Sequence, residues 1–171
     1  LLIEAFRKVA ADYPEAELVI VGDGPELDNL RQQANDLQLT DSIRFIGAVY
    51  DPKTLGAYMN ESSIYVLAGM GGLSINDAKT YGMPVLCAVC DSTERDLVME
   101  GKNGYFFKDG DADSLADRIR EMFESPERCK EMGKESERMI REKINMETVS
   151  ERYLKAFQEI LRLTHSCDSD N

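Results

Sequence analysis

The sequence predicts an α/β domain in which helices cover both faces of a parallel β-sheet. Nearly continuous apolar runs, typical of strands buried on both faces, alternate with segments of helical periodicity. Glycine-rich turns follow several of these runs, and the length of 171 residues fits one domain. We expect the domain to span residues 1–163 and a disordered polar tail to span residues 164–171.

Five apolar runs are the expected strands, and we expect all of them in one sheet because helical crossovers join parallel strands. The runs cover residues 17–22, 43–46, 64–67, 85–88 and 105–107. Segments with helical spacing separate them, at residues 1–9, 27–37, 52–60 and 74–81.

The last third of the sequence is predicted to be helical. One helix carries Leu115 and Phe123, and Ser125 followed by proline is typical of the start of the next. Asn145 can cap a last helix, whose apolar residues are Val149, Tyr153, Phe157 and Ile160. The opening helix has neither a cap nor a methionine before it, so we expect an N-terminally truncated piece of a longer protein.

The composition excludes several classes of function. A formal charge of −12 argues against binding to nucleic acid or to an anionic membrane, and no apolar run is long enough to cross a membrane. Cys87 and Cys90 form a C-x-x-C pair, but a zinc ribbon needs a second such pair, which is absent from the sequence. We expect reduced thiols, no metal, and a cytoplasmic protein.

Three glycine-bearing loops follow expected strands, at residues 22–24, at Gly47 and at residues 69–72. In open α/β sheets, ligands bind beyond the carboxyl ends of the strands. The third loop leads into a helix whose amino end can hold a phosphate through main-chain N–H groups and the helix dipole. The sequence there is neither a Walker loop nor a dinucleotide fingerprint, and a glycine turn needed only for packing is the alternative.

Asp77 lies one turn into this helix. Its carboxylate could accept hydrogen bonds from both hydroxyls of a ribose, or it could be only a charge that favours the helix dipole. The single histidine, His165, lies in the expected tail, which argues against a Ser-His-Asp or Cys-His catalytic set. Asp23, Asp91 and Glu94 also fall near strand ends, where solvated loop charges are the usual interpretation.

In combination, these motifs resemble the C-terminal domain of family 4 retaining glycosyltransferases, whose type B fold pairs two Rossmann-like domains. The resemblance extends from residue 1 to residue 107. The motifs that carry it are LIEAF at 2–6, LVIVGDGP at 18–25, IRFIG at 43–47, GLSINDA at 72–78, GMPV at 82–85 and EGKNGYFF at 100–107.

The resemblance implies a Rossmann-like, three-layer domain that binds a nucleotide-sugar donor. The full protein would transfer a hexose from a UDP-, GDP- or ADP-sugar to a saccharide or lipid-linked acceptor, with retention and without a metal. The acceptor would bind a missing N-terminal domain, through which the protein could also reach the inner face of the membrane. The implied donor-binding residues are Gly22, Gly24, Gly47, Gly69, Gly71, Gly72, Leu73, Ser74 and Asp77.

The sequence departs from the family pattern where two glutamates are expected. The second is replaced by Asp77 and the first by Gly69, so the catalytic residue is unknown. If backbone geometry requires glycine at position 69, a glutamate there is costly, and we expect Gly69→Glu to lower stability without raising the activity of the full protein. The family's arginine and lysine for the donor diphosphate lie upstream of this sequence, and we therefore expect the fragment to be inactive alone.

Two other interpretations remain open. One is a degenerate glycosyltransferase kept for nucleotide binding or partner contact, with Gly69 marking the lost chemistry. The other is a different enzyme with two Rossmann domains, such as a nucleotide-sugar epimerase, although the sequence offers few of the histidine and carboxylate groups that this class needs.

Overall fold

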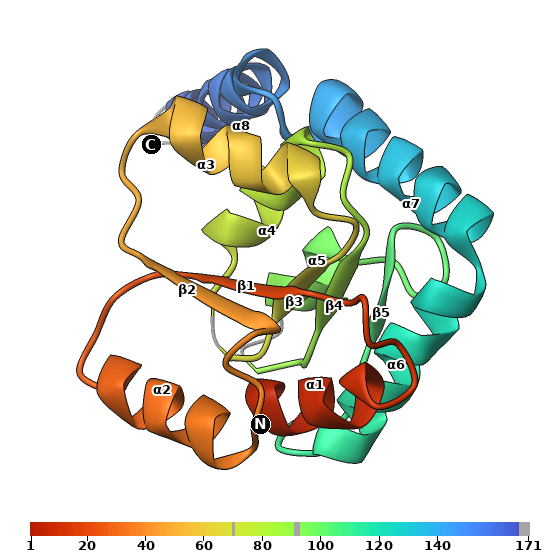
Figure 1. The fold of residues 1–171 in the computed structure, drawn as a ribbon. Coiled ribbons are helices and arrows are strands. Elements are labelled where there is room, and N and C mark those ends of the chain that lie inside the picture. The colour runs from red at the N-terminus through yellow and green to blue at the C-terminus, as the bar shows by residue number, and fades with distance from the viewer. Residues whose placement is uncertain (70, 91–92, 168–171) are drawn as a thin grey trace.

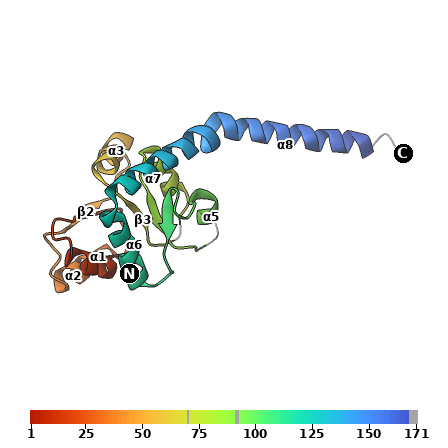
Figure 2. The same ribbon diagram turned by 90° about the vertical axis from the view of Figure 1, so that its right-hand side faces the viewer.

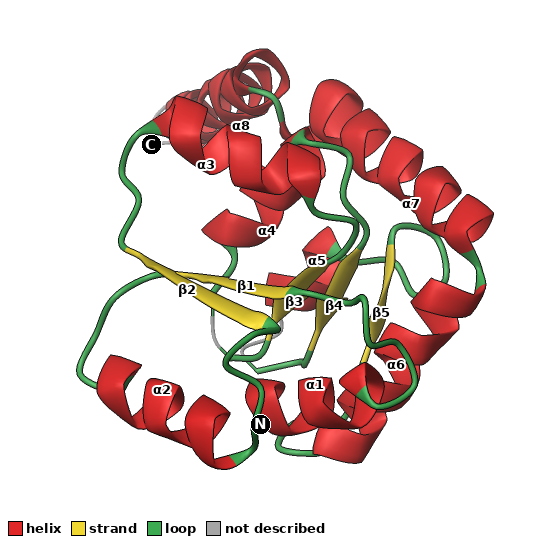
Figure 3. Ribbon diagram, in the orientation of Figure 1, coloured by secondary structure: helices red, strands yellow, loops and turns green. Residues whose placement is uncertain are grey.

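The computed structural model describes residues 1–69, 71–90 and 93–167, and it confirms the predicted α/β class (Figure 3). The strands are β1 (Leu18–Val21), β2 (Ile43–Gly47), β3 (Tyr65–Leu67), β4 (Val85–Cys87) and β5 (Gly104–Phe106). The helices are α1 (Leu2–Ala10), α2 (Leu27–Asp36), α3 (Pro52–Glu61), α4 (Leu73–Thr80), α5 (Thr93–Leu97), α6 (Ala112–Glu124), α7 (Pro126–Met139) and α8 (Met146–Cys167), with a π-helical turn at Ile140–Ile144.

All strand pairs are parallel, as predicted, but the strands form two sheets instead of one. β1 pairs with β2, and β3, β4 and β5 pair in that order. Our expectation of a single five-stranded sheet was therefore wrong. An apolar run shows that a strand is covered on both faces, but it does not show which neighbour takes up its main-chain hydrogen bonds.

Helices cover both sides of the strands, which gives the expected three layers. Figure 1 shows α1, α2 and α6 on one side and α3, α4 and α7 on the other. Separate apolar clusters fill the spaces: one joins α1 and α6 to β4 and β5, a second joins α1 and α2 to the first sheet, and a third lies under α4 and α5. Apolar clusters therefore pack the first sheet against α1 and α2, and the second sheet against helices on both of its faces.

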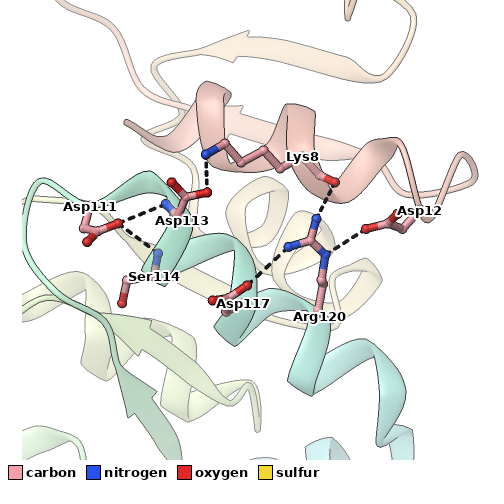
Figure 4. Close-up of polar contacts among 7 residues, drawn as sticks. All are labelled: Lys8, Asp12, Asp111, Asp113, Ser114, Asp117 and Arg120. Carbon is pink, nitrogen blue, oxygen red and sulfur yellow. Dashed lines mark hydrogen bonds and ion pairs between the residues drawn. The ribbon is translucent and has the colours of Figure 1, made fainter.

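Polar contacts fix α1 against α6 (Figure 4). Arg120 of α6 donates from Nη2 to the carbonyl oxygen of Lys8 (2.8 Å) and from Nε to Asp12 (2.8 Å). Lys8 forms an ion pair with Asp113, and Asp111 caps α6 by accepting from the main-chain N–H groups of Asp113 and Ser114. The two helices are close in space although about one hundred residues separate them in the sequence.

The last helix begins as predicted and extends to Cys167. The side chain of Asn145 accepts a hydrogen bond from the Thr148 N–H (2.8 Å), which confirms the cap. Figure 2 shows α8 extending away from the rest of the chain, and the apolar side chains of Tyr153, Phe157 and Ile160 are exposed. The helix ends at Cys167 and thus includes residues 164–167 of the tail that we expected to be disordered.

Candidate functional site

The loops after β1 and β2 lie side by side. The Gly22 N–H donates to the carbonyl oxygen of Gly47 (2.8 Å), and Gly47 has a left-handed backbone with a φ of +81°. Gly24 has open space where a side chain would be, and its N–H donates to Asp23 (2.7 Å). The structure therefore brings these three predicted glycines together, and Asp23 serves as a turn residue.

The loop after β3 leads directly into α4. A Cβ atom on Gly71 would lie 3.6 Å from the Leu67 side chain, and one on Gly72 would lie 3.1 Å from the Thr93 side chain of α5. The backbone at Gly72 thus packs closely against α5. Met70, between these residues and Gly69, lies outside the described residues.

Within the described residues, no side chain forms a capping hydrogen bond at the amino end of α4. Gly72 occupies the cap position and supplies no side-chain oxygen, so the N–H groups of the first turn depend on other partners. Leu73, the first residue of the helix, is 83% exposed, and Asp77 is exposed one turn further along. Exposed N–H groups and the positive end of the helix dipole favour an anion here.

Ser74 lies between the glycine loop and the sheet. Its Oγ is 3.7 Å from the position of a Cβ atom on Gly71. Burial raises the pKa of the Tyr65 phenol in β3, and the Ser74 hydroxyl partly offsets this rise.

The backbone at Gly69 does not require glycine. Its φ is not positive, and among the described residues no atom beyond Gly69 and its chain neighbours lies within 4 Å of the place where its Cβ would be. The expected destabilisation by Gly69→Glu therefore has neither backbone strain nor steric conflict as its cause. An open position here leaves room for a side chain or for a ligand.

The acidic residues near the strand ends differ from one another. Glu94 was expected to be a solvated loop charge, but it is fully buried, and its carboxylate accepts a hydrogen bond from the Cys90 N–H (3.3 Å). It is part of the packing around α5. Asp91 lies outside the described residues, as does the side chain of His165.

The buried cysteine of β4 is not poised for thiol chemistry. Cys87 ends β4 and is fully buried, and burial, followed by the charge of Glu94, raises the pKa of its thiol to about 12. Such a thiol stays protonated at neutral pH and is a poor nucleophile.

Two open hollows lie away from these loops. One, of about 540 Å³, is lined by Arg44 of β2 and by residues of α3, and the other, of about 490 Å³, lies between α7 and the turn before β5. Neither contains a predicted donor-binding residue. Within the described residues there is no cluster of three or more metal-ligating side chains, and no helix is long and apolar enough to cross a membrane.

The predicted site residues therefore form two groups. Gly22, Gly24 and Gly47 lie at the end of the first sheet, and the residues from Gly71 to Asp77 lie at the end of the second. Among the described residues, no hydrogen bond or ion pair connects the two groups. The site is thus an open edge of two sheets.

Solved glycosyltransferase structures share this fold. The chain superposes on HepE from Anabaena, solved in complex with UDP, with a TM-score of 0.81 and 22% identity, covering 92% of this chain and 44% of that one. A C-terminal domain of a glycosyl transferase group 1 family protein from Francisella tularensis, solved by itself, gives a TM-score of 0.76 at 20% identity and covers 84% of this chain and 77% of that one.

Curated relatives are similar over most of this chain. The phosphatidyl-myo-inositol mannosyltransferase of Mycolicibacterium smegmatis is 30% identical over 165 residues, which cover 94% of this chain and 41% of that protein. The N-acetyl-alpha-D-glucosaminyl L-malate synthase of Bacillus anthracis is 24% identical over 161 residues, which cover 94% and 42% respectively. The chain thus spans about two fifths of the length of these relatives.

The family itself follows from a match over most of the sequence. The sequence model described as glycosyl transferases group 1 matches residues 1–139. The strand and helix order and the structural similarity agree with this match, and the predicted type B fold is confirmed as that of one half of such enzymes. The chain belongs to the glycosyl transferases group 1 family.

Proposed function

We propose that this chain is the donor-binding domain of a hexosyltransferase and that the nucleotide-sugar binds at the amino end of α4. The observation that supports this best is the start of α4, which has no side-chain cap among the described residues and follows the glycine loop at the carboxyl end of β3. Such an end provides main-chain donors and a favourable dipole for a diphosphate. An acidic chain can bind an anion in this way without a basic side chain.

Each predicted residue has a role in this proposal. Main-chain N–H groups of Gly71, Gly72, Leu73 and Ser74 hold the diphosphate, and the exposed carboxylate of Asp77 accepts from the ribose hydroxyls. The paired loops at Gly22, Gly24 and Gly47 form the side of the site that faces the base. Gly69 leaves open space near the sugar, where the family has a glutamate.

The donor and acceptor are proposed from relatives. HepE has been solved with UDP and with UDP-glucose, which supports a nucleotide-sugar donor of the UDP, GDP or ADP type. The names of the relatives indicate that hexose-derived sugars are transferred to different small or lipid acceptors. We propose transfer with retention, without a metal, to a saccharide or lipid-linked acceptor that binds an N-terminal domain, in the cytoplasm or at the inner face of its membrane.

The open geometry suggests that the chain needs the rest of the protein for activity. The site is an edge without an opposite wall, and the relatives are more than twice as long. We expect this chain alone to show no transfer and to bind a nucleoside diphosphate with a Kd near the millimolar range. Each missing charge-assisted contact would remove about 1.5–3 kcal/mol of binding free energy.

The test is an assay of the full-length protein with UDP-glucose, GDP-mannose and ADP-glucose, with and without EDTA. Release of one nucleoside diphosphate that depends on an acceptor, with the product anomer identified by NMR, is the expected result. Nucleotide binding without turnover on any donor would support the degenerate alternative. Submicromolar binding to this chain alone would contradict the need for missing basic groups.

A further inference from the structure

The smaller of the two hollows lies at the opposite edge of the second sheet from the glycine loop. It opens between α7 and the turn before β5, and its volume of about 490 Å³ is within the range of small-molecule sites. Because this turn precedes β5, it lies at the amino end of that strand, whereas the glycine loop follows the carboxyl end of β3. We call it the amino-edge hollow, and its charged lining residues are Lys102, Arg128, Glu131, Glu135 and Arg138.

Two guanidinium groups lie over the buried ring of Tyr105 beside this hollow. Arg118 Cζ is 4.8 Å from the ring centroid, and Arg118 also forms ion pairs with Glu100 (3.0 Å) and Glu121 (2.8 Å). Arg128 Cζ is 5.6 Å from the same centroid, but no carboxylate in the described part of the chain forms an ion pair with Arg128. The aromatic ring thus positions the Arg128 guanidinium while its N–H donors stay available.

The turn at Gly101 leaves space beside this guanidinium. Gly101 has a left-handed backbone with a φ of +72°, and a Cβ atom there would lie 3.6 Å from Arg128 Nη2. Because Gly101 has no side chain, one side of Arg128 stays uncovered and open to the hollow.

The other charged groups of the hollow favour a ligand that carries both an anionic group and hydroxyls. Arg138 is already paired with Glu135 (2.6 Å), whereas Lys102 is exposed and forms no ion pair within the described residues. Lys102 and Arg128 are therefore the two cations available to a phosphate group. Glu131 lines the same hollow, and its carboxylate can accept hydrogen bonds from hydroxyl groups.

We propose that the amino-edge hollow is a binding site for a sugar phosphate, separate from the donor site. The Arg128 guanidinium holds two phosphate oxygens, Lys102 adds a second positive charge, and the sugar hydroxyls donate to Glu131. The net charge of −12 repels anions at long range, so binding depends on these local cations and weakens as salt screens them. The proposal does not depend on where the nucleotide-sugar binds.

The test is calorimetric titration of the full-length protein with glucose 6-phosphate, inorganic phosphate and glucose. We expect glucose 6-phosphate to bind most tightly, inorganic phosphate more weakly, and glucose not at all. Arg128→Gln should weaken glucose 6-phosphate binding about 10-fold and Lys102→Gln about 3-fold, the scale of charge-assisted contacts at an exposed site. Glu131→Ala should reduce the preference for glucose 6-phosphate over inorganic phosphate.

Lys134→Gln is the matched control, because it removes an exposed positive charge from α7 outside the hollow. Its binding should equal that of the wild type, and saturating UDP should not displace glucose 6-phosphate. Displacement by UDP would place the sugar phosphate at the donor site and overturn the inference. It would also be overturned by no binding to the wild type, by equal losses in Arg128→Gln and Lys134→Gln, or by glucose 6-phosphate binding no better than inorganic phosphate. None of these outcomes except displacement by UDP bears on the proposed donor site.

Discussion

The Lys79 ammonium group donates a hydrogen bond of 3.1 Å to the carbonyl oxygen of Leu97. Lys79 is fully buried on α4, and the same carbonyl also accepts from the side-chain amide of Asn103 (3.0 Å). Burial, followed by the charge of Lys143, lowers the pKa of Lys79 from 10.5 to about 8. The folded chain therefore carries a buried amine whose charged form it holds poorly.

This amine makes the stability depend on pH. The unfolded chain keeps the Lys79 proton up to about pH 10.5, whereas the folded chain releases it near pH 8. Between these values the unfolded state binds more protons, so the Lys79 contribution to the free energy of unfolding rises with pH. Below pH 8 the full penalty is present, and the pKa difference corresponds to roughly 3 kcal/mol.

We expect Lys79→Met to raise the free energy of unfolding at pH 7 by about 1–3 kcal/mol, because Met fills a similar volume without a charge. Asn103 would still donate to the Leu97 carbonyl, so that group keeps a partner. Urea denaturation at pH 7 and at pH 9.5 measures the effect. The gain should shrink at the higher pH, where wild-type Lys79 is mostly neutral.

The comparison uses the difference between variant and wild type, because other groups titrate in the same range. The raised pKa of Cys87, for example, lowers stability as the pH rises above 9 in both proteins. Lys53→Met, at an exposed position of α3, is the control and should leave the free energy of unfolding unchanged at both pH 7 and pH 9.5. A loss of stability in Lys79→Met at pH 7 would show that the ammonium group is stabilising.

Arg120→Met tests the contact between α1 and α6. The variant loses the hydrogen bonds to the Lys8 carbonyl and to Asp12 but retains an apolar stem. Since Arg120 is partly exposed, we expect a loss of only about 1–2 kcal/mol in the free energy of unfolding, measured by urea denaturation. Arg141→Met, which removes an exposed pair with Glu137, should leave the denaturation midpoint unchanged. Equal effects in the two variants would contradict an anchoring role for Arg120.

Gly69→Glu restores the residue of the family signature. Because the backbone at Gly69 is not left-handed and its Cβ position is open, we expect the melting temperature to stay within about 2 °C of the wild type, a change in stability below about 0.5 kcal/mol. Gly47→Glu is the control, since its φ of +81° should make any side chain costly. A gain in turnover by the full-length Gly69→Glu protein would favour a decayed catalytic position.

Local structure was predictable from the sequence where one short pattern determines it. The apolar run that became β4 and the asparagine at 145 that caps α8 are examples. The short helix α5 was missed because five residues show no periodicity. Ser125 precedes α7 as predicted, yet its side chain makes no capping hydrogen bond, because the preference is statistical and tertiary contacts can replace it.

The loops that form the site were predictable from the sequence, but their backbone conformation and packing were not. Parallel strands place their following loops at one edge, so the glycines could be assigned in advance. The backbone conformation of Gly69 could not be predicted, because glycine adopts positive and negative φ values about equally well. The burial of Lys79 and Glu94 depends on how α4 and α5 pack, which residue type alone does not determine.

Asp77→Asn distinguishes a ribose-binding carboxylate from a helix charge. A carboxylate can accept from both ribose hydroxyls, whereas an amide replaces one acceptor by a donor. In the full-length protein we expect a higher donor KM and a lower kcat/KM, with an unchanged melting temperature. The fall in kcat/KM should correspond to a loss of about 1.5–3 kcal/mol of transition-state stabilisation. Asp77 is exposed, so its substitution leaves the packing of α4 intact.

Asp28→Asn, in the first turn of α2, is the control for losing a helix charge away from the site and should leave the donor kinetics unchanged. If Asp77→Asn instead lowers the melting temperature and keeps normal donor kinetics, the carboxylate serves only the helix dipole, and its assignment to the ribose is wrong.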